Sequence, residues 1–66
     1  MKKINLNLIG LDGNAFSLLG AFNRQAKREG WSGEEIRSVM NEAGKGDYDH
    51  LLSTLMKHCE YEEEDN

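Results

Sequence analysis

The chain has 66 residues, one cysteine and a formal net charge of −4. A chain this short forms one domain and buries only about 60% of its unfolded surface, so it usually needs a disulfide, a metal or oligomerisation. Cys59 has no disulfide partner within the chain, which leaves oligomerisation and suits a reducing compartment. No stretch approaches the ~20 apolar residues of a membrane span, and no export signal is evident. We therefore expect a cytoplasmic protein without membrane partners.

The negative charge is concentrated at the C-terminal end. Residues 1–59 carry seven acidic and eight basic residues, a balance of +1, whereas residues 60–66 add five acidic residues and no base. A segment of this composition cannot bury apolar surface. The sequence therefore predicts a single domain over residues 1–59 and a disordered acidic tail over residues 60–66.

The N-terminal segment, residues 3–9, has the pattern of a β-strand. Ile4, Leu6 and Leu8 alternate with polar residues, and a period of two is typical of a half-buried strand. The glycine-rich residues 10–14 end it. After Asn14 the apolar residues recur with a helical period, so we expect no second strand within the chain.

An unpaired strand exposes backbone groups that need partners. We therefore predict pairing with the same strand of another copy, which gives a homodimer or larger oligomer. The candidate interface residues are Ile4, Leu6 and Leu8, together with Trp31, because a large aromatic side chain is a typical binding anchor.

Three amphipathic helices are expected after the strand. The first has Asp12 or Asn14 as its N-cap and Gly30 as a left-handed C-terminal residue. Its apolar stripe comprises Ala15, Phe16, Leu18, Leu19, Phe22 and Ala26.

The second helix has the clearest start signal. Residues 32–35 (Ser-Gly-Glu-Glu) form a capping box, and Trp31 and Ile36 occupy the positions of a hydrophobic staple. Gly44 ends this helix, and Asp47 caps the third. The apolar stripe of the third helix comprises Tyr48, Leu51, Leu52, Leu55, Met56 and Cys59. The predicted fold is α+β and mostly α, with one strand followed by three short helices.

Two resemblances accompany this pattern. The run GWSGEEIRSVMNEAGKGDYDHLLSTL resembles the back half of ubiquitin-associated-type three-helix domains, with Gly30-Trp31 where that family has Gly-Phe and Gly46-Asp47 opening the last helix. This likeness implies a helical bundle. Residues 11–16 (LDGNAF) and 46–52 (GDYDHLL) are similar to small uncharacterised bacteriophage proteins. That likeness implies a bacterial host cytoplasm and a role in host takeover or defence evasion.

The turn before the first helix is a candidate anion site. Backbone amides around Gly13 and Asn14 would supply donors at a helix N-terminus, and Arg24 or Arg28 of a neighbouring protomer would supply charge. A small anionic ligand such as a nucleotide would then be sequestered at a protomer interface. The alternative is a glycine-rich turn with an Asx cap and no ligand.

Catalytic and metal chemistry have little support. His50 and His58 lie eight residues apart, about 12 Å along a helix, so they cannot share an ion within one protomer. Cys59 is expected to pack as a small apolar residue. We predict no metal, no cofactor and no enzymatic activity.

The basic residues Arg24, Lys27 and Arg28 form a modest patch, but the third helix has only Lys57 as a fixed cation, which argues against DNA binding. The function we expect is a small phage-type accessory protein that binds and blocks or redirects a host protein. The alternative is an oligomeric protein that sequesters a nucleotide-like anion.

Overall fold

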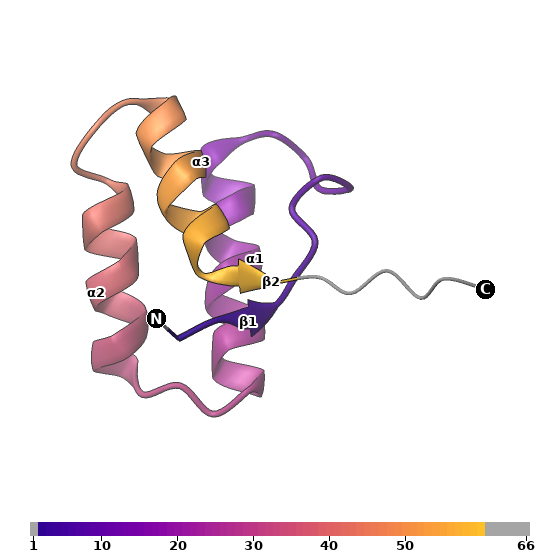
Figure 1. The fold of residues 1–66 in the computed structure, drawn as a ribbon, viewed down its shortest axis with the longest axis vertical. Coiled ribbons are helices and arrows are strands. Elements are labelled where there is room, and N and C mark those ends of the chain that lie inside the picture. Colours follow the sequence, from indigo (N-terminus) through magenta and orange to yellow (C-terminus); the bar gives the residue numbers. More distant parts are fainter. Residues whose placement is uncertain (1, 61–66) are drawn as a thin grey trace.

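The computed structural model describes residues 2–60 and shows three helices packed around one core, with two short strands crossing in front of the first helix (Figure 1). The predicted fold class, mostly α with a short N-terminal strand, is confirmed. In chain order the elements are β1 (Ile4–Asn5), α1 (Ala15–Arg28), α2 (Gly33–Ala43), α3 (Tyr48–Lys57) and β2 (Cys59–Glu60).

Each helix begins at a polar cap that the sequence predicts. The Asn14 side chain accepts from the Phe16 N–H at 2.9 Å, and Asp47 accepts from the His50 N–H at 3.0 Å. At the start of α2 the capping box is complete: Ser32 Oγ accepts from the Glu35 N–H, and the Glu35 carboxylate accepts from the Ser32 N–H. These side chains satisfy amide donors that have no partner within a helix.

The chain leaves α1 through Gly30, whose φ of +90° lies in the left-handed region that side chains disfavour. The Gly30 N–H donates to the Lys27 carbonyl, and the Trp31 N–H donates to the Ala26 carbonyl. This is the C-terminal turn that the sequence predicts. It returns Trp31 to the core, where its indole packs edge-on against the Phe22 ring at a centroid distance of 5.6 Å.

The expectation of an unpaired strand is wrong. The regular strand covers only Ile4–Asn5, and it pairs in parallel with Cys59–Glu60 of the same chain. The Ile4 N–H donates to the His58 carbonyl at 2.8 Å, and the Leu6 N–H donates to the Glu60 carbonyl at 3.2 Å. Two residues have no detectable period, so β2 could not be distinguished from the end of the third helix.

The other edge of β1 is also occupied. The Asn5 N–H donates to the Glu29 carboxylate at 2.8 Å, and Gln25 donates to the same oxygen at 2.7 Å. Pairing between protomers stays a prediction, but the argument for it from unpaired backbone groups no longer applies.

Glu60, the first residue of the predicted tail, belongs to β2. Residues 61–66, where the sequence predicts disorder, lie outside the described residues.

The core draws on every helix and on β1. Its most deeply buried large side chains are Phe22, Ile4, Leu18 and Leu55. Three members of the predicted apolar stripes are instead exposed: Phe16 is 85% exposed, Met56 59% and Tyr48 44%.

Lys2 anchors the segment that leads into β1. Its ammonium lies 2.7 Å from a Glu35 carboxylate oxygen and 5.2 Å from the centroid of the Trp31 ring, and its carbonyl accepts from His58 Nδ1 at 2.9 Å. The Lys2 ammonium and the Ser32 N–H lower the pKa of Glu35 to about 2 from an ordinary 4.5. Lys2, two residues before β1, therefore contacts both the start of α2 and the end of α3.

Trp31→Ala should lower the free energy of unfolding by about 3 kcal/mol, because it removes a buried indole and leaves a cavity. Ser32→Ala should cost about 1 kcal/mol, since only a helix cap is lost. Urea denaturation followed by circular dichroism measures both. Equal losses would contradict the role assigned to Trp31 in the core.

Stability should fall as the pH drops from about 4.5 towards 2. Glu35 has a depressed pKa in the folded state, so its contribution is present above the unfolded value and disappears as the carboxylate is protonated. Glu35→Gln should flatten this part of the profile of urea midpoint against pH. An unchanged slope in the variant would show that Glu35 does not contribute.

Candidate functional site

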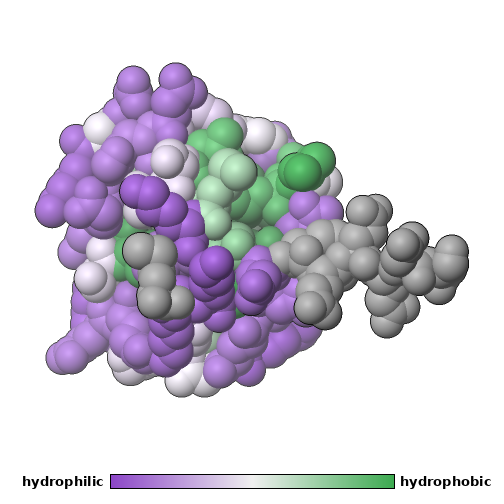
Figure 2. Space-filling model, viewed as in Figure 1, coloured by the Kyte–Doolittle hydropathy of each residue, from purple (hydrophilic) through white to green (hydrophobic). Residues whose placement is uncertain are grey.

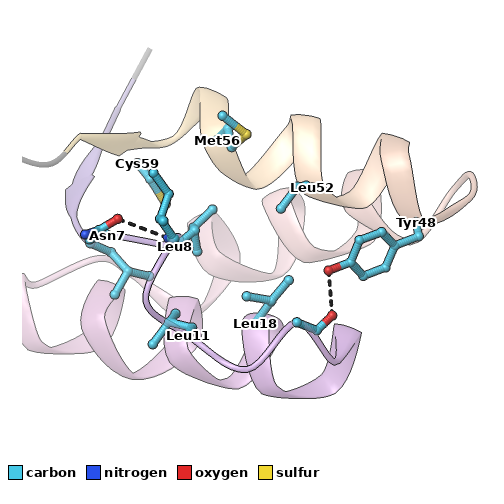
Figure 3. Close-up of a pocket in the computed structure, with 11 residues that line it drawn as sticks. Asn7, Leu8, Leu11, Leu18, Tyr48, Leu52, Met56 and Cys59 are labelled. Atoms are coloured by element: carbon cyan, nitrogen blue, oxygen red, sulfur yellow. Dashed lines mark hydrogen bonds between the residues drawn. The ribbon is translucent and has the colours of Figure 1, made fainter.

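An apolar groove lies between α3 and the segment that follows β1 (Figure 3). It has a volume of about 360 Å³, and none of its 11 lining residues is charged. Leu52 of α3 and Leu18 of α1 point into it from opposite sides (Figure 3). Figure 2 shows hydrophobic surface gathered over this region. Its other aliphatic lining residues include Leu6, Leu8, Ile9 and Leu11.

Several polar groups of the groove bond to one another within the protein. The Tyr48 hydroxyl donates to the Gly13 carbonyl, and the Ile9 N–H donates to the Asn7 side-chain oxygen at 3.0 Å (Figure 3). The rim is formed in part by Ile9, which is 94% exposed, and by Met56. A groove of this kind offers apolar contact rather than hydrogen bonds or charge.

Cys59 lines the inner end of the groove and is partly buried. Burial, together with the nearby Glu29 carboxylate, raises the pKa of its thiol to about 11 from an ordinary 9.0. A nucleophilic cysteine needs a lowered pKa, so this environment opposes catalysis by Cys59. It agrees with the interpretation of Cys59 as an apolar packing residue.

Cys59 should therefore react slowly with a thiol reagent at pH 8. A pKa of about 11 in place of 9.0 lowers the thiolate fraction roughly 100-fold, since only the thiolate reacts. The rate of disulfide exchange with a chromogenic reagent should rise by a similar factor when urea unfolds the protein. Equal rates in the folded and unfolded states would contradict the raised pKa.

In the turn proposed as an anion site, the Asn14 donor is used internally. The Asn14 N–H donates to the Asp12 carboxylate at 3.2 Å, and the Asn14 side chain caps the Phe16 N–H. A carboxylate of the chain thus already lies where an anion would bind, and it would repel a second one.

The four predicted ligand residues do not converge within a protomer. Gly13 and Asn14 precede the first residue of α1, whereas Arg28 is its last residue, about 20 Å away at 1.5 Å per residue. Arg24 is about 15 Å from Asn14 on the same basis. A site using all four would still need two copies, as the sequence analysis predicts.

The candidate interface residues separate into two pairs. Ile4 and Trp31 are 1% and 7% exposed and belong to the core of a single protomer. Leu6 and Leu8 are partly buried and line the groove. Only the second pair lies on an accessible surface.

Both histidines have structural hydrogen bonds. His50 Nε2 lies 2.8 Å from the Glu42 carbonyl and joins α3 to the end of α2, while His58 binds the Lys2 carbonyl. Within residues 2–60, no three His, Cys, Asp or Glu side chains form a group that could hold a metal ion.

A second surface, the α1 outer face, consists of Phe16, Arg24, Lys27 and Arg28, all exposed. Phe16 and Lys27 are three helical turns apart and share one side of the helix, with the arginines beside them. No acidic residue occurs within α1, and its three basic residues all lie in its C-terminal half, so this face combines an exposed phenyl ring near one end with positive charge near the other.

The exposure of Phe16 was missed because it was grouped with the apolar stripe. Phe16 precedes Leu18 by two residues, which turns it about 200° around the helix from that core position. A strict helical projection centred on Leu18, Phe22 and Ala26 could have found it.

Comparison with protein-family models, curated proteins and solved structures found no match to this chain. Within the part of the chain that the structure describes, no helix has the length and apolar character needed to cross a membrane.

Proposed function

We propose that this protein acts without catalysis, by binding a host protein and blocking or redirecting it. The α1 outer face is the surface that would engage the partner. The observation that carries the proposal is Phe16, a large aromatic side chain 85% exposed on a helix without acidic residues.

The chemistry of this face suits a protein partner with an acidic surface. Exposed aromatic and arginine side chains are the residue types that contribute most to binding when a partner buries them. The cations would steer an acidic partner into contact, and Phe16 would fill an apolar pocket. The resemblance to small phage proteins supports a bacterial host protein as the partner.

The proposal can be tested by purifying the tagged protein from bacterial cells under native conditions and identifying what is retained. We expect one host polypeptide in a fixed ratio to the protein. Phe16→Ala and Arg24→Glu should each weaken its binding by about tenfold or more. The effect of Arg24→Glu should shrink at high salt, because screening weakens exposed charge interactions.

Lys45→Glu is the matched control, because it reverses an exposed cation in the loop between α2 and α3. It should leave binding unchanged. If Lys45→Glu and Arg24→Glu lose the host polypeptide equally, its binding depends on charge without specificity. A retained small molecule without any polypeptide would contradict the proposal and favour the sequestering function.

A further inference from the structure

β2 directs the C-terminal end of the domain across α1. The segment that leads into β1 contacts the start of α2 through Lys2 and Glu35. β1 then ends beside α1, where the Asn5 N–H binds the Glu29 carboxylate. β2 runs parallel to β1 and pairs Glu60 with Asn5. It therefore points away from α2, towards the far side of α1 (Figure 1).

Arg24 and Arg28 lie on that far side of α1. Gln25 faces β1, because its side chain binds the same Glu29 oxygen as the strand. The buried Ala26 lies about 100° around the helix from Gln25, towards the core. In the opposite direction, Arg28 lies about 60° and Arg24 about 100° from Gln25. Both arginines are exposed, on the side to which β2 points.

The residues that follow Glu60 are complementary in charge to these arginines. Residues 61–66 contain four acidic residues and no base. Six extended residues span about 20 Å, whereas an α-helix with its side chains is about 10–12 Å wide. The segment is therefore long enough to pass from the end of β2 to Arg28 and to Arg24, one turn earlier. Within residues 2–60, neither arginine forms an ion pair.

We propose that residues 61–66 bind Arg24 and Arg28 of the same chain and compete with the acidic partner for the α1 outer face. The competition rests on the proposed function, whereas the contact between the segment and the arginines does not. Exposed ion pairs are individually weak, but a group attached close to its site has a high effective concentration. Only a partner with a stronger acidic surface would displace the segment, so the contact favours specific binding.

Nuclear magnetic resonance of the full chain tests the contact. A tail variant replaces the four carboxylates by amides, through Glu62→Gln, Glu63→Gln, Glu64→Gln and Asp65→Asn. The side-chain Nε–Hε signals of Arg24 and Arg28 should differ between wild type and tail variant at low salt, and the difference should vanish at high salt. Arg37, exposed on α2, is the internal control and should not shift. Differences confined to Arg37 or to Lys57, or no difference, would overturn the contact.

Binding of a labelled decaglutamate peptide, followed by fluorescence anisotropy, tests the competition. Glu63→Gln/Glu64→Gln should bind the peptide about threefold or more tightly than the wild type, because the arginines are released from exposed ion pairs. Glu34→Gln/Asp49→Asn is the matched control, since it removes two charges from exposed positions on α2 and α3, and it should produce a smaller gain. Circular dichroism would confirm that both variants fold. Equal gains would show an effect of net charge alone and would overturn the competition.

The competition and the proposed function can fail separately. If native purification retains no host polypeptide but Glu63→Gln/Glu64→Gln binds decaglutamate more tightly than the control variant does, the contact stands and the proposed function fails. If a host polypeptide binds the wild type and Glu63→Gln/Glu64→Gln with equal affinity, the proposed function stands and the competition is overturned.

Discussion

The pairing of the first strand with the last is the interaction on which the other features depend. Two hydrogen bonds, from the Ile4 N–H to the His58 carbonyl and from the Leu6 N–H to the Glu60 carbonyl, hold the two ends of the domain together. They place the Ile4 side chain among the helices, where it is 1% exposed. They also hold the segment after β1 beside α3, and the groove lies between that segment and the helix.

Side-chain contacts stabilise a sheet that is too short to be stable by itself. A two-stranded sheet of two-residue strands is not stable alone. Here Glu29 accepts from the free edge of β1, and Lys2 joins the strand to Glu35, Trp31 and His58. These contacts are partly solvent-exposed and join residues far apart in the sequence, and together they fix the position of the N-terminal segment on the helical core.

The two surfaces differ in physical character and lie on opposite sides of α1. The groove is uncharged and lined mostly by aliphatic side chains, and its tyrosine hydroxyl is bonded within the protein, which suits a contact that excludes water. The α1 outer face is basic and carries one exposed phenyl ring, which suits recognition guided by charge.

The sequence by itself determined the helices and their ends, because capping and periodicity are local. Asn14, Ser32 and Asp47 begin the helices as predicted, Gly30 ends the first in the left-handed conformation, and the alternation around Ile4 identified the first strand. The distribution of charge in the sequence also distinguished the acidic C-terminal residues from the nearly neutral remainder of the chain.

Only the tertiary structure decided what these elements contact. The strand partner, Cys59–Glu60, is two residues long and lies more than fifty residues away from β1. A pairing over that distance depends on how three helices pack, and no local pattern encodes it. The same packing buried Trp31 and Ile4, left Ile9 and Phe16 exposed, and used the histidines and the turn at Asp12 for internal hydrogen bonds. The candidate surfaces could not be located from the sequence because exposure follows from the position of an element against its neighbours, whereas periodicity records only which residues share a side of that element.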